Sequence, residues 1–295
     1  MLKNLKQVIA LILIVVMSFS LTACADESAA DIADKVAAKL DSITSMDAKM
    51  EMQFGLEMQL DGQTQNMDTS SVANITSFND PVQMKMDIHM KVDTDGQEQE
   101  IDMESYAVQE DGALAMYTKV FDAWQKQILT VEEQMESVKQ YDAQSNLHIY
   151  LENTDSFKVS SEQLNGVEVY RLDGTLSGQS LREAIEASGT MEQLSQLSNG
   201  SEDLYASMFD NLKDMPVRIW ANKSDLMPVR YEMDMTKTMQ SMIDNLIVAQ
   251  AKATGEAVPA DFKMSIKNVH ISMDMSNFNN ATPIVVPQEA LDSTK

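Results

Sequence analysis

Residues 49–60 alternate strictly between apolar and polar side chains. Every even-numbered position from Met50 to Leu60 is apolar, and every odd-numbered position is polar or glycine. A period of two residues over this length predicts a β-strand with one buried face and one solvated face. Three of the six apolar residues are methionine, which is not among the residues that strands favour. The pattern predicts a long strand and raises the question of what its methionine face covers.

The same alternation returns in later segments, which turn signals separate. Asp-Gly, Asn-Gly or Asn-Asp-Pro sequences lie at 61–62, 79–81, 95–96, 111–112 and 165–166. In the last segment the apolar phase slips at Lys267 and Asn268, which predicts a β-bulge. Strands joined by tight turns favour an antiparallel meander. Besides 49–60, the predicted strands are 82–92, 100–109, 113–119, 124–129, 156–163, 167–176, 217–222, 229–235 and 262–275.

Apolar residues three or four positions apart predict helices. The pattern is clearest at 32–45 and 236–252, and segments 131–150, 180–197 and 202–214 also change to a helical period. A sheet with one polar face must bury the other, and these amphipathic helices are available to cover it. The sequence therefore predicts the α+β class. We expect a single strongly curved antiparallel β-sheet, a half-barrel, with helices packed on its concave face.

The N-terminal segment has the layout of a secretory signal. Two lysines precede a largely apolar run at 8–19, and small residues follow before Cys24. Twelve helical residues span about 18 Å, against about 30 Å of membrane hydrocarbon, so a permanent membrane span is the poorer interpretation. We predict a signal peptide at 1–23, a tether at 24–31 and one domain at 32–295.

The sequence Leu21-Thr22-Ala23-Cys24 resembles the lipobox of bacterial lipoproteins. The alternative is an ordinary signal with an accidental cysteine. In the lipoprotein family the cysteine thiol receives a diacylglyceryl group and becomes the first residue after cleavage. The resemblance implies that Cys24 anchors the protein to the outer face of the cell membrane, since two acyl chains give stable anchoring. Because Cys24 is the only cysteine, its lipidation would leave no thiol for a disulfide, for catalysis or for a metal.

The charge balance argues against several kinds of partner. The chain has 46 acidic and 22 basic residues, for a formal net charge of −24. Loss of residues 1–23 removes two lysines and no acid, which leaves a mature chain of −26. Nucleic acids and anionic lipid surfaces attract basic residues, so we expect no nucleic acid partner and no membrane contact except the anchor.

No motif in the sequence nominates catalytic chemistry. The three histidines, His89, His148 and His270, lie far apart, and we expect them at the surface. In segment 93–100 a glycine follows the first aspartate by three positions, whereas a calcium-binding EF-hand loop needs five. That segment predicts a solvated hairpin turn. We expect no catalytic residue, no metal site and no cofactor.

Methionine is the remaining signal, with 24 residues in the chain. One interpretation is that methionine fills an irregular core between the sheet and the helices. The other is that its flexible, polarisable side chains line a cavity for variable apolar ligands. The candidate cavity residues are Met50, Met52, Phe54, Met58, Met84, Met86, Ile88, Met90, Met239 and Met242.

The order of elements resembles the LolA/LolB-like superfamily, which includes the mycobacterial LppX-type lipoproteins. Three stretches carry the resemblance: LNGVEVYRLDG at 164–174 as a mid-sheet hairpin, PVRIWANKSDLMPVRYEM at 216–233, and FNNATPIVVPQEA at 278–290. The last is similar to the closing segment of uncharacterised Gram-positive surface lipoproteins. The resemblance implies a half-barrel whose concave apolar face holds helices and, in some members, a lipid.

Two functions follow from this resemblance and from the methionine pattern. The first is non-catalytic binding or transport of a lipid or other apolar ligand by a membrane-anchored extracytoplasmic lipoprotein. The alternative is a protein-interaction or envelope-sensing module with a filled core, whose protein partner is unknown.

Overall fold

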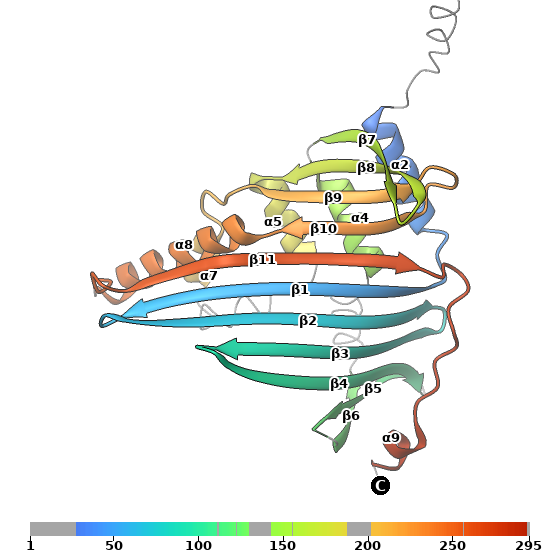
Figure 1. Cartoon of the computed structure of the whole chain (residues 1–295), viewed down its shortest axis with the longest axis horizontal. Helices are drawn as coiled ribbons and strands as arrows, with labels where there is room; N and C mark the ends of the chain where they lie inside the picture. The colour runs from blue at the N-terminus through green and yellow to red at the C-terminus, as the bar shows by residue number, and fades with distance from the viewer. Residues whose placement is uncertain are drawn as a thin grey trace, which may run out of the picture.

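The described part of the chain forms one open antiparallel sheet with helices packed against it (Figure 1). It comprises residues 28–110, 112–121, 123–129, 143–154, 156–187, 202–255 and 257–293 of a computed structural model. The strands are β1 (Ser45–Leu60), β2 (Gln63–Asn79), β3 (Val82–Thr94), β4 (Gln97–Glu110), β5 (Ala113–Val120), β6 (Ala123–Leu129), β7 (Phe157–Leu164), β8 (Val167–Leu176), β9 (Met215–Asn222), β10 (Pro228–Asp234) and β11 (Lys263–Ser276). The helices are α2 (Ala29–Leu40), α4 (Ala143–Asn153), α5 (Gly178–Ala187), α7 (Glu202–Met208), α8 (Thr236–Thr254) and α9 (Gln288–Asp292). The predicted α+β half-barrel is confirmed.

The first and last strands of the chain meet at the centre of the sheet. The strand order is β6-β5-β4-β3-β2-β1-β11-β10-β9-β8-β7. One half is a meander that runs outward from β1 to β6, and the other half runs inward from β7 to β11. Strand periodicity predicts all of these strands except β2, but it does not predict this central pairing of β1 with β11.

The strand β2 is missing from the sequence prediction, which has no strand between residues 60 and 82. The side chains that β2 turns to the same face as the methionines of β1 include Ser71, Ala73 and Ser77. These residues are small or polar, so the alternation that marks a half-buried strand is weak here. In the structure β2 lies between β1 and β3, and the two methionine-bearing strands are therefore not neighbours.

The predicted bulge is confirmed in the central strand pair. Gly55 of β1 pairs with Asn268 of β11, but the next residue, Leu56, pairs with Ile266, so Lys267 is the extra residue. A Cβ atom on Gly55 would lie 2.8 Å from a carboxylate oxygen of Asp68. Glycine at this position thus lets the two strands and β2 approach closely around the bulge.

The first helix begins earlier than the sequence predicts. Helix α2 starts at Ala29, inside the predicted tether, because Ser28 and Asp31 form a capping box. The Ser28 hydroxyl accepts a hydrogen bond from the Asp31 amide at 3.1 Å, and the Asp31 carboxylate accepts one from the Ser28 amide at 3.2 Å. These bonds satisfy amides that would otherwise lack partners at the helix start. The Ser28 hydroxyl also donates a hydrogen bond to the Asp31 carboxylate at 2.8 Å, and this bond, together with the one from the Ser28 amide, lowers the pKa of the Asp31 carboxyl.

Helices cover one half of the inner face, which we define as the face that carries the even-numbered residues of β1. Figure 1 shows α4 and α5 behind the strands β8–β10. Helices α2, α4 and α5 complete the main core against β8–β11 and the start of β1, as predicted for the concave face. The fully buried residues that the helices and β9 supply to this core include Val36, Leu40, Leu147, Leu181 and Ile219.

Helix α8 lies along an edge of β11 that β10 leaves uncovered. The strand β10 pairs only with residues 270–274 of β11. Nearer the start of β11, the Gln240 side chain accepts a hydrogen bond from the Ile266 amide at 2.7 Å and donates one to the Met264 carbonyl at 3.1 Å. The Thr236 hydroxyl accepts from the Val269 amide at 2.9 Å. The helix thereby satisfies backbone groups of an otherwise open strand edge.

The closing segment 278–290 crosses to the outer face of β5 and β6. Asn279 holds its beginning, because its side-chain oxygen accepts a hydrogen bond from the Thr44 amide at 2.6 Å. At its end, Ala290 is fully buried in a small second core that includes Tyr106. The end of the chain thus covers part of the outer face of β4–β6.

Some predicted segments differ in position or lie outside the described residues. The hairpin at 164–174 lies at the edge of the sheet, not in its middle, because β7 is an end strand. Residues 1–27, 130–142 and 188–201 lie outside the described part, and with them lie Cys24, the predicted signal peptide and parts of two predicted helices.

Candidate functional site

A groove of about 400 Å³ lies on the inner face of β2–β5, beside the half that helices cover. Two rows of side chains across the strands form its floor. In one row Ser77, Met84, Ala107 and Met116 stand opposite one another, and in the next row Met86, Ser105 and Thr118 do so. The described lining residues are Ser77, Phe78, Asn79, Val82, Gln83, Met84, Met86, Ile88, Met103, Ser105, Ala107, Leu114, Met116 and Thr118.

A small side chain on β2 helps to make this groove possible. Ser77 lines it, whereas Ala73 of the same strand is only 1 % exposed and lies in the main core, opposite Ile88 of β3. A large residue at position 77 would extend into the groove. The small polar side chain at this position therefore weakens the strand signal of β2 and also leaves space in the groove.

The sequence candidates occupy three different environments. Met84, Met86 and Ile88 line the groove. Met50 packs against the main core, and Met242 on α8 is only 2 % exposed. The remaining candidates are half-buried and are not among the described lining residues: Met52, Phe54, Met58 and Met90 on the inner face, and Met239 on α8.

Several lining residues were not among the sequence candidates. Met103 and Ser105 belong to one face of a predicted strand, and Met116 lies on the next strand. Their membership could have been found by extending the register through the turns at 95–96 and 111–112. That step needs the order of neighbouring strands, which the Asp-Gly hairpin signals supply locally.

The chemistry of the groove is apolar with a few neutral polar groups. No charged residue is among its described lining residues. Its polar side chains are hydroxyls and amides, and the Ser105 and Thr118 hydroxyls lie 3.3 Å apart within hydrogen-bonding distance. Hydroxyls and amides without a neighbouring base or metal do not supply general acid–base catalysis. The arrangement is suited to burying an uncharged apolar molecule.

Two of the three histidines, His89 and His148, take part in surface contacts. His89, on the outer face of β3, lies 2.7 Å from the Asp102 carboxylate. His148 of α4 lies 3.0 Å from the carboxylate of Asp41, at the end of α2. Among the described residues, no group of three or more His, Cys, Asp or Glu side chains could hold a metal ion.

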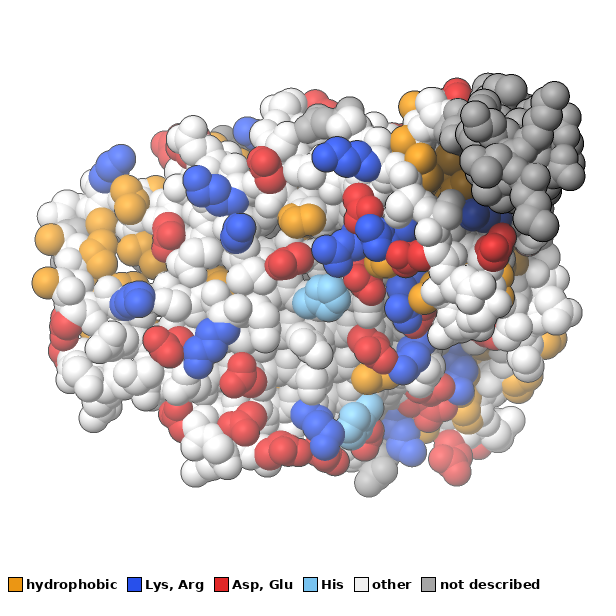
Figure 2. Space-filling view, turned by 45° about the horizontal axis from the view of Figure 1, so that its top comes forward, with side chains coloured by type: hydrophobic (Ala, Val, Ile, Leu, Met, Phe, Trp, Pro, Cys, Tyr) orange, Lys and Arg blue, Asp and Glu red, His pale blue; other side chains and the backbone are white. Residues whose placement is uncertain are grey.

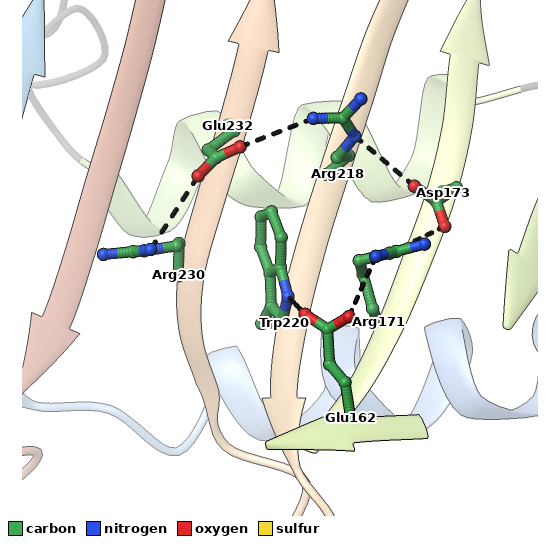
Figure 3. A network of polar contacts seen from close by, with 7 residues as sticks. All are labelled: Glu162, Arg171, Asp173, Arg218, Trp220, Arg230 and Glu232. Carbon is green, nitrogen blue, oxygen red and sulfur yellow. Dashed lines mark hydrogen bonds and ion pairs between the residues drawn. The ribbon is translucent and has the colours of Figure 1, made fainter. Parts of the chain in front are cut away.

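The outer face of β7–β10 carries a row of alternating charges (Figure 3). Arg230 donates two hydrogen bonds to Asp274 at 2.6 and 2.8 Å, and these bonds raise the pKa of its guanidinium. A hydrogen bond to Asp173, together with the charges of Asp173 and Glu162, likewise raises the pKa of Arg171. Figure 2 shows basic and acidic side chains interleaved on this face. The row in Figure 3 consists of Glu162, Arg171, Asp173, Arg218, Trp220, Arg230 and Glu232.

These charges neutralise one another. Arg218 lies 3.5 Å from Asp173 and 3.7 Å from Glu232, and the Trp220 indole donates to Glu162. A row of cross-strand pairs of opposite charge supports the sheet and leaves little attraction for a free anion. The groove, not the outer face, is therefore the candidate site.

Helix length bears on membrane attachment. Within the described ranges, no helix has both the length and the apolar character that are needed to cross a bilayer.

Comparison with known proteins gives one family and several solved structures. The model of DUF6612, a family of unknown function, matches residues 28–295. No curated protein matches the chain in sequence. LprF from Mycobacterium bovis matches at 10% identity and a TM-score of 0.47, over 88% of this chain and 95% of LprF. The Mycobacterium tuberculosis lipoprotein LppX matches at 12% identity and a TM-score of 0.42, over 87% of this chain and 98% of LppX. LppX, the type protein of the resemblance that the sequence predicts, is thus one of the solved structures that match the chain.

Proposed function

The chain belongs to DUF6612, a family of unknown function, and we propose that it is a lipid-anchored extracytoplasmic protein that binds a lipid or other apolar molecule without catalysis. The ligand occupies the groove on the inner face of β2–β5. Cys24 carries the diacylglyceryl anchor, which holds the domain near the membrane that supplies the ligand.

One observation carries the proposal: the described residues of β2–β5 leave an apolar groove on the inner face of the sheet. Its volume of about 400 Å³ is in the range of small-molecule sites. Four methionines line it, Met84, Met86, Met103 and Met116. Unbranched thioether side chains adapt their shape to different ligands, which suits a site that accepts a class of molecules.

The test is to look for a bound apolar molecule and for stabilisation by added lipid. The chain that begins at Ala25 keeps every described residue and lacks the anchor. Native mass spectrometry before and after solvent extraction should detect an apolar adduct. A ligand at about 100 times its Kd should stabilise the extracted protein by about 2.7 kcal/mol.

A groove-filling variant gives the matched control. Ala107→Phe places a ring on the groove floor and should abolish both the adduct and the stabilisation. Ser70→Phe adds a ring on the exposed outer side of β2 and should change neither. Unfolding curves of both variants establish that they fold. Wild-type protein with no adduct and no stabilisation by lipid would contradict the proposal, as would an Ala107→Phe variant that binds normally.

The alternative, an interaction or sensing module, has one specific observation in its favour. Helices α2, α4 and α5 fill the inner face of β8–β11. Crosslinking in cells that repeatedly captures one protein, together with failure to bind any apolar molecule, would favour this alternative.

A further inference from the structure

The groove contains buried hydroxyl groups as well as thioethers. Ser77 is 9 % exposed and Ser105 is 7 % exposed, and both line the groove. The Ser77 hydroxyl oxygen is not among the buried, unpartnered side-chain atoms of the described residues, so it stays reachable from the groove. A hydroxyl that faces a groove can bond to water or, in place of that water, to a polar atom of a ligand.

The hydroxyls of Ser105 and Thr118 form a pair that also has one hydrogen available for a further bond. Ser105 and Thr118 lie 3.3 Å apart, and either one can donate to the other. Each hydroxyl has one hydrogen, so after the pair has formed its bond one O–H remains available as a donor. The groove floor therefore offers two hydrogen-bond donors, one at Ser77 and one at the Ser105–Thr118 pair.

The surroundings of these donors exclude an ionised ligand group. The described lining contains no Lys, Arg or His that could neutralise a buried carboxylate or phosphate. Taking such a group out of water without an opposite charge is strongly unfavourable. The net charge of −24 also repels anions from the whole molecule.

We propose that the groove selects an apolar chain that bears an uncharged oxygen acceptor, such as the carbonyl of an ester. The chain packs on Met84, Met86 and Ile88, and the acceptor takes a hydrogen bond from Ser77 or from the Ser105–Thr118 pair. This selection rests on the proposed function and adds to it the chemical class of the ligand. Neutral esters bind better than ionised fatty acids and better than plain hydrocarbons.

The test compares three compounds with the same twelve-carbon chain: methyl laurate, laurate at pH 8, and dodecane. Apparent affinities come from the rise in unfolding temperature of the delipidated chain from Ala25 at matched free concentrations. Methyl laurate should bind about tenfold more tightly than either of the others. Ser77→Ala, Ser105→Ala and Thr118→Val combined in one variant remove every hydroxyl donor of the groove floor and should weaken methyl laurate binding about 3- to 10-fold, the usual effect of one neutral hydrogen bond, and leave dodecane unchanged.

The control is Ser70→Ala, which removes a hydroxyl from the outer face of the same strand as Ser77 and should have no effect. Laurate binding as tightly as methyl laurate would overturn the selection, as would a combined hydroxyl variant that binds the ester normally. Equal binding of all three compounds leaves the proposed function intact and removes only the selection. Failure of all three to bind contradicts the proposed function itself.

Discussion

At the scale of single residues, methionine has two different roles in this molecule. Met242 on α8 is 2 % exposed and is packed on all sides. Met86 is half-buried, touches the main core on one side and faces the groove on the other. Both residues are apolar and lie on amphipathic patterns. Only the surroundings of each side chain therefore show whether it fills the core or lines the groove.

We predict that truncating these two methionines has unequal effects on stability. Met242→Ala should lower the free energy of unfolding by about 2–5 kcal/mol, because the cavity it leaves is enclosed. Met86→Ala should cost less than half as much, because its side chain already borders open space. Urea unfolding of the two variants measures the difference. Met242→Leu, which nearly conserves volume, is the control and should cost under about 1.5 kcal/mol. Equal losses for the two alanine variants would contradict the distinction.

The sequence predicts which face of a strand these residues occupy, but not what covers that face. Alternation places Met84, Met86 and Ile88 on the buried side, and they do line the groove. Met50 follows the same alternation and, like them, packs against the core, but it is not among the described lining residues of the groove. The difference depends on which helices reach each part of the sheet, and a period of two residues contains no information about this.

At the scale of elements, α8 acts as a cover for the free edge of β11. Gln240 bonds to both a backbone amide and a backbone carbonyl of that strand. An uncovered strand edge invites pairing with another chain, so this helix protects the sheet as well as packing on it.

Gln240→Ala should therefore destabilise the protein by about 1–3 kcal/mol, because it leaves the amide of Ile266 without its acceptor. Gln250→Ala, at an exposed position of the same helix, should change stability by less than about 0.5 kcal/mol. Urea unfolding measures both effects, and hydrogen exchange at Ile266 should accelerate only in the first variant. An unchanged exchange rate at Ile266 would show that the side chain does not protect this edge.

The boundaries of most elements follow from the sequence, but their partners do not. The predicted helix at 236–252 is close to α8, and its amphipathic stripe indicates burial. Its polar residues Thr236 and Gln240 look like ordinary solvated positions in sequence. Their bonds to β11 arise because β10 is short, which only the assembled sheet makes evident.

At the scale of the whole molecule, two meanders share one core. Helix α2 and strand β1 belong to the first half of the chain, and they pack with α4, β9 and β10 from the second half. The central pairing of β1 with β11 joins the two halves along thirteen residue pairs. Neither half has a complete core of its own.

Division of the chain between residues 130 and 143 should test this interdependence. Each half alone should lack a cooperative unfolding transition, because it exposes core residues and one edge of the central strand pair. The two halves mixed together should recover near-UV circular dichroism and a single urea transition. The intact chain is the control, and a cooperative transition in either isolated half would contradict a shared core.

The α+β class is predictable because it depends on local periods, which survive in any strand order. The strand order cannot be predicted from local periods, because most of the chain separates β1 from β11. In the sequence, the slip in phase at Lys267 and Asn268, which marks the bulge, is the one sign of this pairing.

The central position of β1 has a consequence for the protein during its synthesis. Roughly 200 residues separate the end of β1 from the start of β11, and at about 5–20 residues per second a ribosome needs roughly 10–40 s to add them. Throughout that interval β1 can pair with β2 but has no partner on its other edge. The nascent chain, rather than the finished fold, is therefore the form of this molecule that is most exposed to aggregation.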